Sequence, residues 1–266
     1  MPDILICPLC QSPLHVKNQQ LYCEHKHSFD KAKEGYVNLL SVQHKRSKEP
    51  GDNKQMLHNR QQFLDSGHYQ PLADQLASYI NERVATKTIL DIGCGEGFYT
   101  HQLKNSRNQV WGCDISKEGI KYAAKHYKSC QFVVASNQRL PFATESLDVI
   151  TRVFAPQHDA EVIRCLHPRG QLITVVPGPW HLKQLRQYIY TDLRAHNNQP
   201  QSIDGLQLKE SINIQYTMLL SPTDRERLMG MTPFSWKLTP SIRAQFTHAQ
   251  EPVEAQFTLH IYQHES

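Results

Sequence analysis

The stretch Thr88–Gly97 (TILDIGCGEG) decides the fold of this 266-residue chain. It begins as a short apolar strand, passes through alternating glycines and continues into a helix-like segment at 98–104. Glycines at a strand-to-helix turn let the backbone bend sharply and let a ligand approach closely. The stretch therefore predicts the first strand, turn and helix of a nucleotide-binding α/β domain.

The spacing of the acid and the glycines separates two classes of cofactor. A dinucleotide-binding turn reads G-x-G-x-x-G and directs a helix N-terminus at a pyrophosphate. Here Asp91 stands two residues before the first glycine, where a carboxylate repels a pyrophosphate but suits the ammonium of an aminoacyl group. The pattern D-x-G-x-G-x-G favours S-adenosylmethionine as the ligand of Asp91, Gly93, Gly95 and Gly97.

Two later positions complete the predicted donor site. Asp114 follows the strand-like segment 110–113, 21 residues after Gly93, and is placed to accept hydrogen bonds from both ribose hydroxyls. NAD enzymes share this feature, so it identifies the nucleoside and not the methyl donor. Ser136 and Asn137 end the next strand, where we expect the adenine to be contacted.

The order of elements predicts a Rossmann-like sheet. Strands alternate repeatedly with helices, which indicates a parallel sheet with helices on both faces. Two closing strands are expected to form an antiparallel edge, and Ser221-Pro222 is typical of a helix start. The predicted strands are 88–90, 110–113, 131–135, 147–154, 171–176, 212–220 and 253–263; the predicted helices are 98–104, 117–127, 158–166 and 181–195, with a turn at 167–170.

The first 30 residues hold a candidate structural zinc site. Cys7 and Cys10 form a knuckle that aims two thiolates at one point, and Cys23-x-x-x-His27 supplies a second pair. His25 stays open as an alternative fourth ligand, although the longer spacing to His27 lets the chain turn back toward the metal. Four protein ligands leave no position for catalysis, and a module this small depends on its metal for stability.

Composition predicts a soluble cytoplasmic protein. Hydrophobic residues make up 39% and charged residues 20%. No apolar run approaches the roughly 18 residues of a membrane span, and the N-terminus lacks the features of a signal peptide. The seven cysteines are odd in number and unevenly spaced, which argues against a disulfide framework.

The chain is expected to divide into three parts. Residues 1–40 form the zinc module, which the strand-like segment 35–40 closes, and residues 85–266 form the methyltransferase domain. Between them, residues 41–84 carry a basic linker and two helices, near 53–65 and 71–84. The net charge of +4 is too small to prove nucleic-acid binding, and the linker is either a phosphate contact or a solvated surface loop. Its Lys/Arg residues are Lys45, Arg46, Lys48, Lys54 and Arg60.

The segment after the fourth strand restricts the acceptor. Phe154-Ala155-Pro156 is neither the tetrapeptide that grips an exocyclic amine nor a Pro-Cys nucleophile for carbon-5 methylation. A ring nitrogen, an oxygen or a small molecule remains, and Phe154 is placed either to stack on a flipped base or to pack in the core. His158 and Asp159 are candidate bases by position only, and no catalytic base is assigned.

The motifs together resemble a known family, the bacterial 23S rRNA (guanine-N1) methyltransferases of the RlmA type. The resemblance covers nearly the whole chain, from Cys7 to the MTPFSW segment. It implies methyl transfer to N1 of one guanine in an rRNA stem-loop, with the zinc module helping to recognise the RNA. It also implies that Tyr69, His181 and the loop around Gly95 and Glu96 contact the donor. The motifs are CPLC, CEHKH, SFDKAKEGYVNLL, QHKRSKEPGD, FLDSGHYQPL, LDIGCGEGFYT, RLPF and PGPWHL.

The sequence departs from the pattern of this family at two places, and two other functions remain as alternatives. Phe154 stands where a tyrosine is expected, and HPRG replaces the commoner KPGG at 167–170. One rival is a small-molecule methyltransferase, for example on quinones, against which the zinc module and the basic linker argue. The other is a non-catalytic RNA-binding protein, against which the intact donor motif argues. The sequence leaves open which guanine is modified and whether the protein forms a homodimer.

Overall fold

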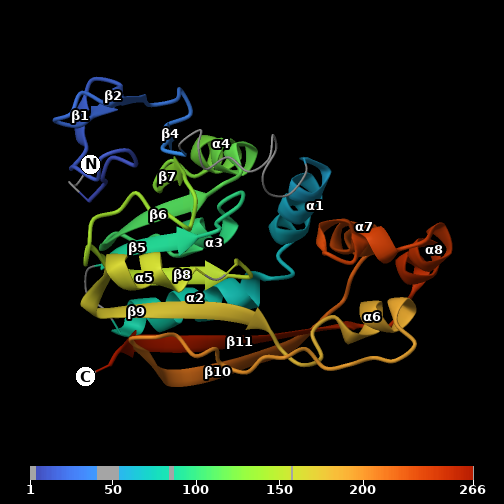
Figure 1. Cartoon of the computed structure of the whole chain (residues 1–266). Helices are drawn as coiled ribbons and strands as arrows, with labels where there is room; N and C mark the ends of the chain where they lie inside the picture. Colours follow the sequence, from blue (N-terminus) through green and yellow to red (C-terminus); the bar gives the residue numbers. More distant parts are fainter. Residues whose placement is uncertain (1–3, 41–53, 84–86, 157, 266) are drawn as a thin grey trace.

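An eight-stranded mixed sheet organises the computed structural model, which describes residues 4–40, 54–83, 87–156 and 158–265 (Figure 1). The strand order is β10-β11-β9-β8-β5-β6-β7-β4. The chain winds from β5 to β6 and β7 on one side and to β8 and β9 on the other, so ligands are expected where β5 and β8 end. The central strands are β5 (Lys87–Ile92), β6 (Asn108–Asp114), β7 (Gln131–Val134), β8 (Leu147–Val153) and β9 (Leu166–Pro177).

Helices cover both faces of the sheet, as predicted. Successive strand residues point to opposite faces, so Ile89 and Leu90 of β5 lie in two different hydrophobic clusters. The face of Ile89 packs against α2 (Gln70–Arg83), α3 (Phe98–Gln102) and α4 (Lys117–His126). The face of Leu90 packs against α5 (Asp159–Cys165) and the N-terminal module.

The N-terminal module is a three-stranded antiparallel sheet of β1 (His15–Lys17), β2 (Gln20–Tyr22) and β3 (Ser28–Asp30). Its buried residues Leu14 and Leu21 belong to the same cluster as Trp111 of β6 and Phe142. The amide of Ile6 also donates to the carbonyl of Pro141 at 3.0 Å. The module therefore completes one face of the large sheet.

Strand β4 (Val37–Asn38) links the module to the large sheet: Val37 forms an antiparallel bridge with Lys31, just after β3, and also reaches β7. Val37 pairs in parallel register with Val133 of β7, so β4 forms the outer strand of the large sheet. Without it β7 would be an edge strand with unpaired backbone groups. The buried side chain of Val37 also joins the core beneath.

The antiparallel edge is present as predicted. β11 (Val253–His264) pairs with β9, and β10 (Leu206–Met218) forms the outermost strand beside it. The predicted turn at 167–170 lies inside β9, opposite a shift of register. No helix in the described part of the chain has the length and apolarity needed to cross a bilayer.

The helix predicted at 181–195 is shorter, and α6 runs only from Lys183 to Ile189. The guanidinium of Arg186 donates to the carbonyls of Pro179 and Arg194, which holds the chain after α6 folded back. The residues that follow α6 therefore form an irregular segment and do not continue the helix. It crosses β11, where the hydroxyl of Tyr262 accepts from the amide of Gln201 at 3.0 Å.

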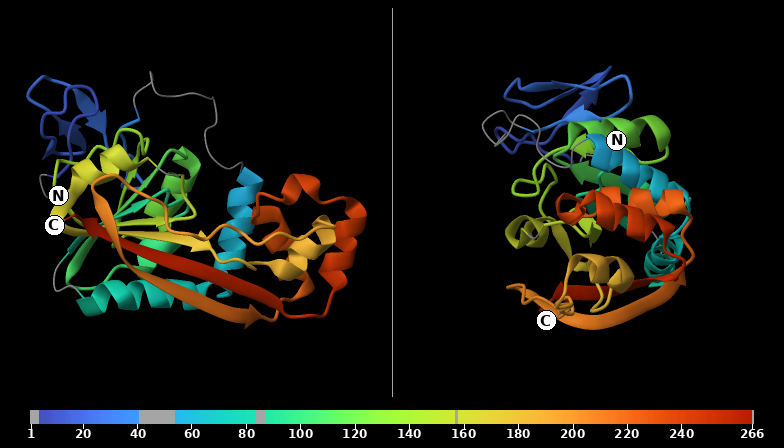
Figure 2. Two further views of the ribbon diagram at one scale, coloured as in Figure 1. Left: turned by 60° about the horizontal axis from the view of Figure 1, so that its bottom comes forward. Right: turned by 90° about the vertical axis from the view of Figure 1, so that its right-hand side faces the viewer.

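A group of helices extends beyond the end of the sheet (Figure 2). It consists of α1 (Lys54–Asp65), α7 (Pro222–Met231), the 3-10 turn η2 (Ser235–Lys237) and α8 (Pro240–His248). Ser221 caps α7 as predicted, through its hydroxyl and the amide of Asp224. α1 packs against α7 where the side chain of Asn59 meets the bare backbone of Gly230.

Candidate active site and metal centre

The glycine loop after β5 lies where β5 and β8 end. Gly93, Gly95 and Gly97 all have left-handed backbones, with φ of 70°, 54° and 85°. A Cβ on Gly93 would stand 2.5 Å from the Cβ of Ala155, which follows β8, so a side chain here would collide with the neighbouring strand end. Gly93 remains exposed on its outer side. The bare backbone can thus be approached closely by a ligand.

Asp114 ties the end of β6 to this loop. Its two carboxylate oxygens accept hydrogen bonds from the amides of Gly95 at 2.9 Å and Ser116 at 2.7 Å. The side chain is half-buried beside the exposed glycine backbone. Each carboxylate oxygen can accept a further bond, so this position suits the ribose hydroxyls of a nucleoside.

Asp91 lies deeper than its position in the motif indicates. Its carboxylate is 2% exposed and accepts hydrogen bonds from the hydroxyls of Thr100 at 2.7 Å and Thr151 at 2.9 Å. Burial raises the pKa of Asp91 to about 6, against the opposing effect of these two hydrogen bonds. Asp91 is therefore a buried, costly charge at the base of the glycine loop.

Tyr69 and His181 meet although 112 residues separate them. The hydroxyl of Tyr69 lies 3.2 Å from Nε2 of His181, and Nδ1 of His181 accepts from the amide of Gln256 at 3.2 Å. Burial lowers the pKa of His181 to about 3, so the ring is neutral. Because Nδ1 accepts, the ring proton is on Nε2 and points to the tyrosine oxygen. The phenolic proton of Tyr69 is thus available to a ligand.

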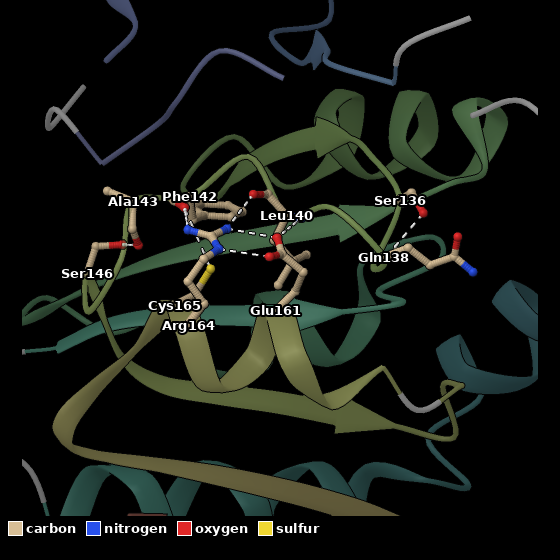
Figure 3. Close-up of polar contacts among 9 residues, drawn as sticks. All are labelled: Ser136, Gln138, Leu140, Phe142, Ala143, Ser146, Glu161, Arg164 and Cys165. Carbon is tan, nitrogen blue, oxygen red and sulfur yellow. Dashed lines mark hydrogen bonds and ion pairs between the residues drawn. The ribbon is translucent and has the colours of Figure 1, made fainter. Parts of the chain in front are cut away.

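The loop carrying Ser136 and Asn137 is fixed by α5. Figure 3 shows Arg164 of α5 donating to the carbonyls of Leu140 at 2.9 Å and Phe142 at 2.8 Å, beside its ion pair with Glu161. Asn137 itself donates to the carbonyl of Pro156 at 3.3 Å. The predicted adenine loop therefore contacts the acceptor segment directly.

Phe154 occupies an unusual position at the end of β8. Its side chain is 44% exposed, and its backbone has a φ of 55°, a left-handed conformation that is strained for an aromatic residue. Its ring lies 5.7 Å from the ring of Phe257. Asp159, a candidate base, starts α5 and accepts from the buried guanidinium of Arg152 at 3.1 Å. His158 is the N-cap residue of the same helix.

The predicted metal ligands gather at one point. The ligand atoms of Cys7, Cys10, Cys23 and His27 all lie within 4.8 Å of one another. Nδ1 of His27 is 3.5 Å from the sulfurs of Cys7 and Cys23, and the sulfurs of Cys10 and Cys23 are 3.6 Å apart. A tetrahedron with Zn–S of about 2.3 Å and Zn–N of about 2.0 Å has edges of about 3.5 to 3.8 Å. The four residues therefore fit zinc.

His25 is placed elsewhere. Its Nδ1 lies 3.0 Å from the hydroxyl of Ser12, and its side chain is 58% exposed. Of the basic linker, Lys54 and Arg60 lie on α1, whereas Lys45, Arg46 and Lys48 are outside the described residues. Arg60 approaches the donor loop, 3.9 Å from the position of a Cβ on Gly95.

Several residues of the site have no recognisable signal in the sequence. Thr100 and Thr151 hold Asp91, and Phe257 packs against the ring of His181 at 4.6 Å. Their roles depend on contacts between segments 9 to 76 residues apart. Gly119, near the start of α4, also packs against the glycine loop, because a Cβ there would stand 2.8 Å from the carbonyl oxygen of Gly95.

Fold and site define a class: an S-adenosylmethionine-dependent methyltransferase with a zinc ribbon. Residues 5–48 match the family described as "RlmA, N-terminal", and residues 89–170 match the family described as "Methyltransferase domain". The Cys3His cluster lies in the first match and the glycine loop in the second.

Relatives that align with most of this chain identify a particular family within this class. The candidate 23S rRNA (guanine-N(1)-)-methyltransferase YxjB of Bacillus subtilis is 32% identical, over 86% of this chain and 86% of its own. The 23S rRNA (guanine(748)-N(1))-methyltransferase of Streptomyces fradiae is 30% identical, over 89% and 87%. A relative of the same description from Micromonospora griseorubida, also a candidate, is 29% identical over 95% of both chains. This chain belongs to the 23S rRNA (guanine-N1) methyltransferase family.

Proposed function

We propose that this protein transfers a methyl group from S-adenosylmethionine to ring nitrogen N1 of a guanine in a 23S rRNA stem-loop. The observation that carries the proposal is the extent of the match: relatives described by this activity align over 86 to 95% of the chain. The alignment therefore includes the zinc ribbon as well as the donor site. Because such a substrate is cytoplasmic in bacteria, we also propose a cytoplasmic location.

The donor site is assigned from the groups that face the glycine loop. Asp114 would accept from the ribose hydroxyls, and the bare backbone from Gly93 to Gly97, with Glu96 beneath it, would admit the aminoacyl part. Ser136 and Asn137 would contact the adenine from the loop that α5 holds. Asp91 would attract the ammonium from below the loop.

Tyr69 and His181 would close the site on the side of β9. His181 holds the tyrosine oxygen, which leaves the phenolic proton for a carboxylate of the donor. A neutral imidazole suits this task because it adds no charge beside the sulfonium. These two residues are positioning groups for the donor.

On the acceptor side the protein mainly orients the base and excludes water. The bound donor supplies a methyl group made electrophilic by its sulfonium. Phe154, exposed beside Ala155 and the glycine loop, would stack on the guanine and aim N1 at the donor. Guanine N1 must lose its proton before its lone pair can attack, so we expect the rate to rise with pH.

The zinc ribbon has a structural role in this proposal. Cys7, Cys10, Cys23 and His27 would complete a closed tetrahedron, which leaves no coordination site for substrate. The ribbon packs on the same face of the sheet as Phe142, next to the adenine loop. We also propose that the chain divides into three parts, residues 1–40, 41–84 and 85–266, and limited proteolysis would test this division.

The decisive experiment uses 23S rRNA that lacks the modification. The purified protein is incubated with this RNA and donor labelled in the methyl group, and the digested nucleosides are identified. Label in 1-methylguanosine is the expected result. Label in another nucleoside would overturn the choice of acceptor atom. No label in RNA, with donor binding intact, would favour a small-molecule acceptor or a non-catalytic RNA-binding protein.

A further inference from the structure

Three aromatic side chains are exposed at one end of the molecule. Phe154, Trp180 and Trp236 are 44%, 40% and 79% exposed, whereas a fourth, Tyr22, lies in the zinc ribbon. Phe154 contacts the ring of Phe257, and so does His181, the neighbour of Trp180. Phe154 therefore lies beside the buried ring of Phe257, and the backbone of Trp180 lies next to the same strand, since its amide donates to the side chain of Gln256 at 2.8 Å.

Helix α6 connects this pair to Trp236. Trp180 lies just before α6 and Tyr190 just after it, about 10 Å further along a seven-residue helix. Nζ of Lys237 is 3.2 Å from the hydroxyl of Tyr190, which places η2 and its Trp236 at that far end. We call Phe154, Trp180, Tyr190 and Trp236 the aromatic stripe.

Lysines accompany both tryptophans of the stripe. Nζ of Lys183 lies 5.7 Å from the ring centroid of Trp180, and Nζ of Lys237 lies 4.9 Å from that of Trp236. A base has an aromatic face and its backbone carries a negative charge, so a ring beside an ammonium matches both parts of a nucleotide. Single-stranded RNA is recognised in this way, since its bases are free to stack on side chains. The charges disfavour an apolar protein partner.

We propose that the aromatic stripe binds the unpaired nucleotides next to the target guanine. Bases stack on Trp180 and Trp236, while Lys183 and Lys237 turn from the rings to the phosphates. This inference rests on the proposed function, because it takes the RNA to enter the site past Phe154. It places an RNA-contacting surface beside α6, at the other end of the molecule from the zinc ribbon (Figure 1).

The test compares Trp236→Ala, Trp236→Phe and the control Leu208→Ala, which removes an exposed apolar side chain from β10. Removal of one base-stacking ring is expected to raise KM for an rRNA stem-loop at least about fivefold. Phenylalanine, which still stacks, should restore most of the loss. kcat at saturating RNA and affinity for S-adenosylhomocysteine should match those of the wild type in all three variants.

Fluorescence tests the contact without catalysis. The chain has three tryptophans, and Trp111 is buried, so in Trp180→Phe the only exposed tryptophan is Trp236. Stacking of a base should quench its emission when the stem-loop is added, and salt should reverse the effect. A KM of Trp236→Ala equal to that of the wild type, together with unquenched emission in Trp180→Phe, would overturn the inference about the aromatic stripe. The proposed function would still stand if the wild-type protein formed 1-methylguanosine. An inactive wild type would instead refute the function itself.

Discussion

Asp91→Asn is predicted to stabilise the ligand-free protein while weakening donor binding. The carboxylate is buried at the base of the glycine loop, and in the described part of the chain it accepts hydrogen bonds from the hydroxyls of Thr100 and Thr151. An asparagine keeps both hydrogen bonds, because its oxygen accepts from Thr100 and its nitrogen donates to the hydroxyl of Thr151. The substitution therefore removes a buried charge without removing its neighbours.

The magnitude follows from the pKa of Asp91. Burial raises it from 3.8 to about 6, and a shift of about 2 units corresponds to about 3 kcal/mol. The folded protein binds a proton here between pH 4 and 6 that the unfolded chain does not bind. Stability from this group is thus lost as pH rises through that window, and nearly the full cost is present above about pH 7. The variant should be more stable than the wild type by up to about 3 kcal/mol at pH 8, and about 1.4 kcal/mol of that gap should close by pH 5.

Chemical denaturation of both proteins at pH 5 to 8, with zinc in excess and no donor, measures this gap. The difference between the two proteins cancels the contribution of His181, whose pKa burial lowers to about 3. Asp114→Asn is the matched control. Its carboxylate accepts from the amides of Gly95 and Ser116, and an asparagine can accept only one of these bonds, so this variant should lose stability.

The Asp91→Asn substitution is also predicted to weaken binding of the methyl donor. Without the charge of Asp91 the affinity for S-adenosylmethionine should fall about tenfold or more in calorimetry, which is the cost of removing one ionic attraction at a partly buried site. An Asp91→Asn protein that is no more stable than the wild type at pH 8, or a gap that stays constant from pH 5 to 8, would refute the assignment of a strained buried charge. Unchanged donor affinity would refute its electrostatic role.

Three further predictions concern the loop, the metal and the positioning pair. Gly93→Ala should lower donor affinity at least tenfold in calorimetry because its methyl group would stand 2.5 Å from a neighbouring one; Gly205→Ala, with a similar φ of 78° and open space, should not. Cys23→Ser should abolish stoichiometric zinc in elemental analysis, whereas His25→Ala should keep it. Tyr69→Phe should cost about 1 to 3 kcal/mol in denaturation, since it leaves a buried imidazole N–H without its acceptor.

The sheet could be predicted from the sequence because its signals are local. Apolar strands alternate with amphipathic helices, and the turn at Thr88–Gly97 marks the first crossover. The pairing of β4 with β7 could not be predicted, because two residues carry no information about which sheet edge they complete. α8 was missed although Thr239-Pro240 repeats the start signal of α7, since nine residues offered too weak a pattern to support it.

In the candidate site, too, some features could be predicted from the sequence and others could not. The spacing of Cys7, Cys10, Cys23 and His27 indicates a tetrahedron because the metal itself demands it, and the structure gathers these ligand atoms within 4.8 Å. Asp91 could be located from its motif, but the cost of its charge depends on burial by residues distant in the chain.

The meeting of Tyr69 with His181 shows where reasoning from residue patterns ends. Neither residue is singled out by the spacing of a motif, and their hydrogen bond forms beside Phe257 of the late strand β11, whose ring centroid lies 5.1 and 4.6 Å from those of Tyr69 and His181. The amide that sets the tautomer of His181 belongs to the preceding residue of the same strand. A donor-binding group is thus built by three segments that share no local signal, so only the resemblance to a family could single it out before the fold was known.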